Sequence, residues 1–163
     1  LSADAEIIDV YVHSPKANEI VIVPLMTGGT LPDEDALQKI QEVYADDIRP
    51  MTDVVTVKAP EQVSYDIHIK YYCTLEQEAD AISVVEGENG AIRQYNDYQC
   101  SALGRDINPD QLKKYILAPK SGLEAVERVD ILSPTFTELS SLQVAKFSGE
   151  LTVSHEVIGG DGV

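Results

Sequence analysis

The chain has 163 residues, 44% of them hydrophobic, and a formal net charge of −16. This composition fits a globular protein, and no apolar run in the sequence approaches the roughly 20 residues of a membrane-spanning helix. Because 28 acidic residues outnumber 12 basic ones, the chain should repel a phosphate backbone, and we expect neither nucleic acid nor a membrane as a partner. Cys73 and Cys100 are too few for a zinc site, and we expect both to be reduced.

Residues 1–60 have the pattern of a hairpin, a helix and a third strand. Alternation over 8–13 and an almost continuous apolar run over 19–26 predict the hairpin, whose first strand should bury one face. The apolar residues that alternate in this first strand are Ile8, Val10 and Val12. Helical spacing then predicts a helix over 32–46, and a β-branched run predicts a strand over 53–59.

A long strand and several helices follow in the sequence. In the strand predicted over 63–73, an apolar face that includes Tyr65, Ile67, Ile69, Tyr71 and Cys73 alternates with polar residues. A helix should begin after Thr74, and we expect Gly87 and Gly90 to kink or split it. A short helix should start at Asn108 and Pro109, which are favoured residues for a cap and a first turn.

The last part of the sequence returns to strands, predicted over 126–133 and 141–156. The order strand, Ser-Pro, strand occurs at 8–26 and again at 128–147, which suggests two diverged copies of one unit. Taken together, the elements predict an α+β fold of two small units, each with a mainly antiparallel sheet and helices packed on one face. We place the first unit at 1–60 (hairpin, helix, strand) and the second at 61–163 (strand, helices, hairpin).

Residues 47–60 carry the most specific local pattern. A helix must end before Pro50, because proline cannot continue it and pushes the preceding residue toward extended geometry. Arg49 and Asp53 should then lie at the two ends of a tight corner, where the guanidinium can reach the carboxylate or the last carbonyls of the helix. We interpret Arg49, Pro50 and Asp53 as a structural corner, with a ligand site at these residues as the less favoured alternative.

Nothing in the sequence has the spacing of an enzyme site. The three histidines fall in separate segments, and no phosphate-binding loop, zinc-protease motif or calcium loop is present. We therefore predict a chain that is not an enzyme and uses no cofactor or metal. Acidic residues occur in blocks, which suit solvated faces and helix N-termini. The candidate interaction faces are Asp33, Glu34, Asp35, Glu76, Glu78, Asp80, Glu86 and Glu88.

Several of these segments together resemble the C-terminal part of the baseplate J-like family, which are baseplate wedge proteins of contractile tailed phages of the Mu-like type. The motifs are DVYVHSP at 9–15, IRPMTDVVTV at 48–57, LGRDI at 103–107 and VDILSP at 129–134. Their order and spacing agree with the family and span most of the chain. The sequence departs from the family at 16–18, where a glycine-bearing turn is replaced, and at Gly87 and Gly90.

The resemblance implies a structural component of the tail baseplate of a contractile phage or prophage, assembled in the bacterial host cytoplasm. Its partners would be other baseplate or tail proteins, and a homodimer is also compatible with it. The alternative is a stand-alone acidic α+β adaptor that binds a basic protein partner. Because the chain starts without an initiator Met or a signal segment, we expect it to be cut from a longer protein.

Overall fold

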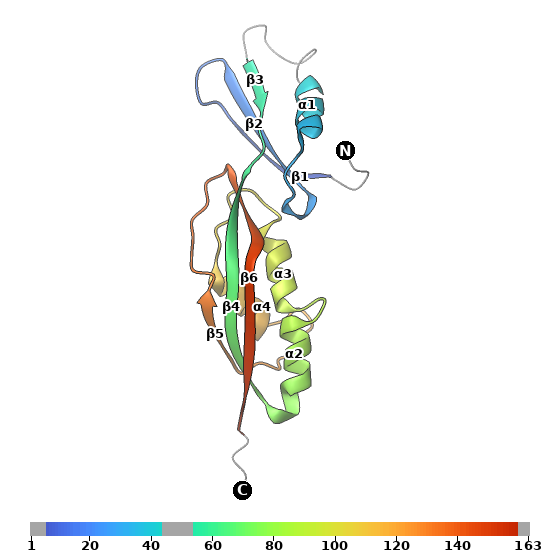
Figure 1. Ribbon diagram of the computed structural model, residues 1–163, viewed down its shortest axis with the longest axis vertical. Coiled ribbons are helices and arrows are strands. Elements are labelled where there is room, and N and C mark those ends of the chain that lie inside the picture. The colour runs from blue at the N-terminus through green and yellow to red at the C-terminus, as the bar shows by residue number, and fades with distance from the viewer. Residues whose placement is uncertain (1–5, 44–53, 160–163) are drawn as a thin grey trace. The chain divides into compact units, whose positions relative to one another are not determined.

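The computed structural model describes residues 6–43 and 54–159, which fold into two compact units (Figure 1). The strands are β1 (Ile7–His13), β2 (Glu19–Met26), β3 (Val54–Val57), β4 (Glu61–Thr74), β5 (Arg128–Ser133) and β6 (Gln143–Ile158). The helices are α1 (Glu34–Val43), α2 (Glu78–Glu86), α3 (Ala91–Gln99) and α4 (Pro109–Leu117), with short 3-10 helices η1 (Thr27–Gly29) and η2 (Leu75–Gln77). The predicted α+β fold is confirmed.

The two units are not simple consecutive halves of the sequence. Unit 1 comprises the described residues up to Val63 together with two later segments, 100–105 and 139–145. Unit 2 comprises 64–99, 106–138 and the described residues from 146 on. The first unit therefore extends past the boundary predicted at residue 60, and it includes two short segments that the sequence pattern had assigned to the second.

Sheet A of unit 1 has the strand order β1-β2-β3. β1 and β2 form the predicted antiparallel hairpin, whereas β3 is parallel to β2, so the sheet is mixed. The helix α1 covers one face of the sheet, where Leu37 and Ile40 pack against a small core of Ile22, Val55 and Val57. This packing follows from the helical spacing of Leu37 and Ile40, which places both side chains on one side of α1.

A proline in the middle of β2 is tolerated because of where its nitrogen points. The carbonyls of Asn18 and Ile22 accept hydrogen bonds from Val54 and Lys58, at 2.7 and 2.9 Å, so even-numbered residues of β2 face β3. Pro24 comes next on that side, beyond the last β2–β3 pair. Its missing N–H therefore breaks no bond of the ladder.

The buried face of β1 is the opposite of the predicted one. In the β1–β2 pairing, Val10 lies across from Pro24 and Val12 lies across from Ile22. The side chains of Val10 and Val12 therefore lie on the same face of the sheet as Ile22, which is the face that α1 covers. Because α1 packs over β2 and β3, it leaves Val10 and Val12 46% and 55% exposed. The other face of β1 is partly buried instead, and there the Asp9 carboxylate accepts a hydrogen bond from the Leu103 N–H at 2.9 Å.

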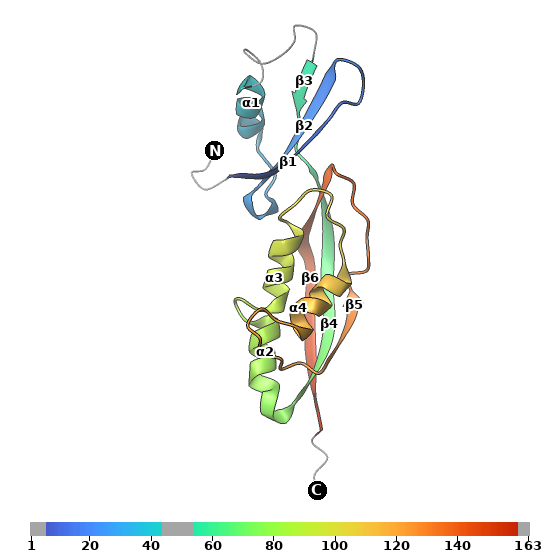
Figure 2. The same cartoon turned by 180° about the vertical axis from the view of Figure 1, so that it is seen from behind.

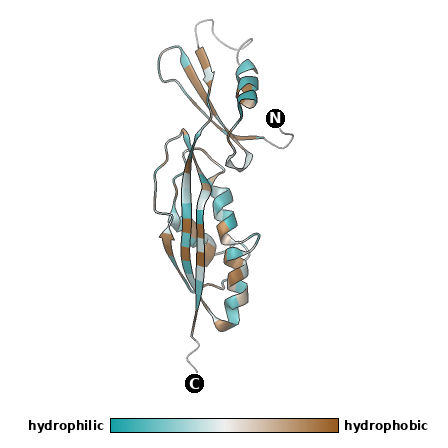
Figure 3. Ribbon diagram, in the orientation of Figure 1, coloured by the Kyte–Doolittle hydropathy of each residue, from teal (hydrophilic) through white to brown (hydrophobic). Residues whose placement is uncertain are grey.

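Sheet B of unit 2 is built around β4, in the order β5-β4-β6. The predicted apolar face of β4 is confirmed, because Tyr65, Ile67, Ile69, Tyr71 and Cys73 are all buried. The helices α2, α3 and α4 cover this face, as the two opposite views show (Figures 1 and 2). Apolar residues alternate with polar ones along β4 in the same sheet (Figure 3).

The predicted second hairpin is wrong, since β5 and β6 lie on opposite sides of β4. β5 runs antiparallel to β4, whereas β6 runs in the same direction as β4, so this sheet is mixed too. A direct β5–β6 pair would leave one edge of the buried strand β4 without hydrogen-bond partners. The repeat argument, which needed a hairpin over 128–147, is therefore not supported.

Two local signals for the helices of unit 2 hold in the structure, whereas the helix predicted to begin after Thr74 starts as the 3-10 turn η2, and α2 begins at Glu78. The predicted long helix is split into α2 and α3 at the segment that contains Gly87 and Gly90. Asn108 caps α4, with its side chain accepting a hydrogen bond from the Asp110 N–H at 2.9 Å, and Pro109 is the first helical residue. Within the described residues, no helix is long and apolar enough to cross a membrane.

Gly149 of β6 provides a test of the β4–β6 pairing. A Cβ at this position would overlap the Asp66 carboxylate and approach the Tyr65 carbonyl oxygen to 2.7 Å. Gly149→Ala should therefore lower the free energy of unfolding, measured with urea, by about 1–3 kcal/mol. The control Ser154→Ala, at an exposed position of the same strand, should change it by less than about 0.5 kcal/mol. Equal values for the two variants would contradict this pairing.

Candidate functional site: interaction surfaces

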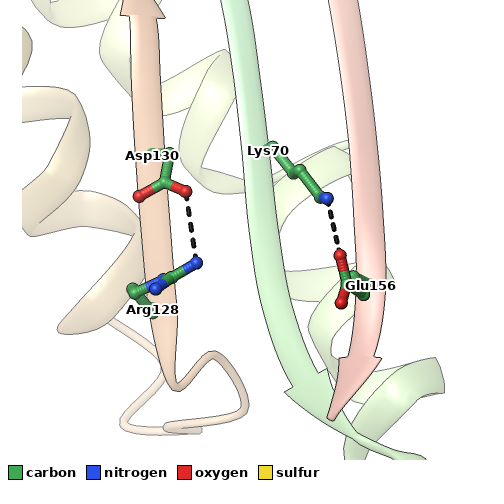
Figure 4. A network of polar contacts seen from close by, with 4 residues as sticks. All are labelled: Lys70, Arg128, Asp130 and Glu156. Atoms are coloured by element: carbon green, nitrogen blue, oxygen red, sulfur yellow. Dashed lines mark hydrogen bonds and ion pairs between the residues drawn. The ribbon is translucent and has the colours of Figure 1, made fainter.

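The face of sheet B opposite the helices carries two pairs of oppositely charged side chains (Figure 4). The Lys70 ammonium lies 2.6 Å from the Glu156 carboxylate, and the Arg128 guanidinium lies 3.4 Å from Asp130. Both cations also lie near the Tyr72 ring, at 5.1 Å for Lys70 and 3.9 Å for Arg128. The hydrogen bond to Glu156 raises the pKa of Lys70 above its ordinary value.

This network makes the open face of sheet B a surface of paired charges. Each of the two cations has a carboxylate partner, and exposed pairs of this kind add little stability. The alternation of β4 correctly placed Lys70 and Tyr72 opposite the apolar face. Their partners Arg128, Asp130 and Glu156 come from other strands, and no pattern within β4 could have identified them.

The first acidic block lies at the start of α1. The Asp33 carboxylate accepts a hydrogen bond from the Ala36 N–H at 2.8 Å, which satisfies one of the unpaired amides of the first turn. Glu34 and Asp35 are exposed in that turn, where the helix macrodipole favours negative charge. Asp33 therefore has a structural role, and Glu34 and Asp35 remain as the surface charges of this block.

In the second acidic block, two of the five candidates have partners within unit 2. Glu78 lies 3.0 Å from the His155 imidazole, and Glu86 accepts a hydrogen bond from the Tyr71 hydroxyl at 2.7 Å. Glu86 is exposed despite this hydrogen bond, and so are the other three candidates, Glu76, Asp80 and Glu88. The block is therefore part structural and part solvated surface.

The structural corner predicted at Arg49, Pro50 and Asp53 lies outside the described residues. Its role as a corner stays a prediction. The strand that should follow it is observed as β3, which begins at Val54.

A hollow of about 510 Å³ lies in unit 2, beside the turn between α2 and α3 and the loop after α4. Its lining mixes apolar residues, among them Val84 and Leu123, with polar residues and one side chain of each charge, Glu88 and Lys120. The Lys120 ammonium lies 5.7 Å from the Tyr115 ring. This mixed lining has no set of converging polar groups that would indicate a particular class of ligand. We assign this hollow no function.

The titratable groups do not gather into a metal-like cluster in the part of the chain that the structure describes. Over residues 6–43 and 54–159, no group of three His, Cys, Asp or Glu side chains is close enough to hold an ion. His13 stacks on Tyr11 in β1, and His155 stacks on Tyr71. The expectation that the chain is not an enzyme stays a prediction.

Comparisons with known proteins add no identification. No protein-family model matches the chain, and no curated protein sequence matches it. The surfaces described above therefore have to be interpreted from their own chemistry.

Tyr71 links the core of unit 2 to its acidic surface and gives a test that depends on pH. Burial, and then the hydrogen bond to Glu86, raise the pKa of Tyr71 above its ordinary value. The stability from this hydroxyl should be complete below about pH 10, where the unfolded tyrosine is still neutral, and should decrease as pH rises further. Tyr71→Phe should lower the free energy of unfolding at neutral pH by about 1–2 kcal/mol.

The same variant should also make the alkaline loss of stability less steep, because one raised tyrosine pKa has been removed. Urea unfolding followed by circular dichroism, at neutral pH and above about pH 10, measures both effects. An unchanged alkaline slope would show that the Tyr71 hydroxyl is not held in the buried environment described here.

Proposed function

We propose that this chain is a structural protein of a contractile tail baseplate, a wedge subunit that acts by binding other baseplate or tail proteins. The observation that carries the proposal is the order and spacing of the four motifs at 9–15, 48–57, 103–107 and 129–134, which resemble the baseplate J-like family. A phage, or a prophage whose tail assembles in the host cytoplasm, is the source that this resemblance implies.

The surface chemistry supports a role in assembly. Exposed acids begin α1 and surround α2, and the chain as a whole carries a net charge of −16. Like charge opposes association between copies of the chain, so isolated molecules should stay monomers or dimers. A partner with a basic surface would be attracted to the same acids, which would raise its rate of association more than its final affinity.

A stand-alone adaptor that binds a basic protein is the second candidate. The exposed acids Glu34, Asp35, Glu76, Asp80 and Glu88 favour a basic partner under either proposal. The identity of the bound protein distinguishes the two, because only the first proposal requires a tail or baseplate component.

Co-expression of the full-length gene with its neighbouring genes, followed by pull-down at low and high salt, tests the proposed function. We expect tail or baseplate proteins to be recovered, and in larger amount at low salt, because exposed charges are screened as ionic strength rises. Recovery of an unrelated basic protein alone would favour the adaptor. A bound metabolite that the chain converts would contradict both.

Variants that remove the negative charges test whether the acidic block of α1 speeds association with the partner protein. Glu34→Gln combined with Asp35→Asn should slow association several-fold at low salt, with little effect at high salt. The matched control, Glu138→Gln combined with Glu150→Gln, removes the same charge at two exposed positions outside the blocks. Equal association rates for the two variants would show that overall charge, rather than this block, attracts the partner.

A further inference from the structure

The two outer edges of sheet A differ in how their backbone groups are satisfied. At the β3 edge, the Gln41 side chain of α1 takes the place of a neighbouring strand. Its amide nitrogen donates to the Val55 carbonyl at 3.3 Å, and its amide oxygen accepts from the Val57 N–H at 3.4 Å. A strand edge covered in this way is protected against pairing with another chain.

The β1 edge has no such cover over its second half. The carbonyls of even-numbered β2 residues accept hydrogen bonds from β3, so the backbone groups of odd-numbered β2 residues point toward β1. There they pair with Tyr11 and His13. The backbone groups of Val10 and Val12 therefore point away from the sheet. The Asp9 carboxylate accepts a hydrogen bond from the Val10 N–H at 2.9 Å. No other described residue forms a hydrogen bond with the outward backbone groups of Val10 or Val12.

The side chains at this edge are apolar and exposed. Ile7 lies across from Met26, so it shares the α1 face of the sheet with Val10 and Val12. These three residues, which we call the β1 strip, are 46%, 46% and 55% exposed. An open strand edge beside an apolar strip is the arrangement that accepts an added strand, with main-chain hydrogen bonds giving affinity and alternate side chains giving specificity.

We propose that the β1 edge from Val10 to His13 is a docking site for a short strand of a basic partner protein. An added strand would continue sheet A, with its alternate apolar residues lying beside the β1 strip. This inference rests on the proposed function in one respect, namely that the chain acts by binding other proteins.

Charge near the edge determines which kind of strand fits. Glu6 directly precedes β1 and is exposed, and Asp9 lies within the strand. At the other end, Glu19 opens β2 and is 3.9 Å from Lys16. The strand that complements this edge therefore alternates apolar residues with Lys or Arg, and a second copy of this acidic chain is disfavoured.

The length of the edge limits the strength of docking. The pairing register between β1 and β2 shifts between Ile7 and Asp9, and the Asp9 carboxylate accepts a hydrogen bond from the Val10 N–H. The first half of β1 is therefore irregular and partly closed to an added strand. The open part holds a strand of about four residues, which binds weakly by itself. In an assembly, a second contact through the exposed acids would raise the effective affinity.

An NMR titration of the isolated chain tests the docking site. The probe is a soluble peptide that alternates valine and lysine, and the control peptide has glutamate in place of lysine. We expect the amide signals of Val12 and His13 to shift with the lysine peptide, and its dissociation constant to be at least about tenfold lower than that of the glutamate peptide. Equal binding of the two peptides, or shifts only elsewhere, would overturn the proposal.

Matched variants locate the contact. Val12→Lys should weaken binding of the lysine peptide about tenfold, whereas Leu75→Lys makes the same change at another exposed apolar residue, 69% exposed, and should leave it unchanged. If Val12→Lys does not fold, Val12→Thr keeps the strand and should weaken binding several-fold. Equal affinity of the edge variant and the Leu75→Lys control would overturn the site.

The state of the edge before the peptide is added is measured by amide exchange. The Val12 amide should exchange rapidly in the free chain at all concentrations. Slow exchange would overturn the proposal by showing that another segment of the chain, or a second copy, already covers the edge. Pull-down of baseplate proteins by Val12→Lys at the unmodified level would likewise reject the docking site, while leaving the proposed function intact.

Discussion

The alternation of side chains along β4 is the constraint on which unit 2 depends. Five residues from Tyr65 to Cys73 project to one side and are buried there by α2, α3 and α4. The Tyr65 and Tyr95 rings meet edge to face at 5.8 Å, and the Tyr71 hydroxyl reaches Glu86 at 2.7 Å, so even the polar atoms of this face contact the helices. With one face covered, the opposite face is left for the paired charges near the Tyr72 ring.

The alternation of side chains predicted the buried face of β4 correctly and the buried face of β1 incorrectly. The two outcomes differ for a physical reason. In β4 the two faces differ strongly, because Asp66, His68 and Lys70 oppose apolar residues. In β1 both faces are compatible with burial, since valines alternate with Tyr11 and His13. Which face becomes buried then depends on where α1 packs, and a pattern within one strand cannot determine that.

Strand order was the other property that the sequence did not determine. Helix caps and glycine breaks act over a few residues, and Asn108, Gly87 and Gly90 were interpreted correctly from the sequence. Pairing of β5 and β6 with opposite edges of β4 depends on contacts between residues far apart in the chain. For the candidate surfaces, the sequence identified the acidic blocks, but it could not show that Glu78 and Glu86 have partners or that no described residue hydrogen-bonds the outward groups of Val12 in β1.

We propose that this acidic protein acts by docking on other proteins, and that the β1 edge of sheet A, which no described residue covers at Val12, is one docking site. Hydrogen–deuterium exchange, measured on the isolated chain and on the same chain in its purified native assembly, tests this claim most directly. The account predicts rapid exchange of the Val12 amide in isolation and marked protection of residues 10–13 in the assembly. Exchange rates that are the same in both states along the whole chain would contradict it.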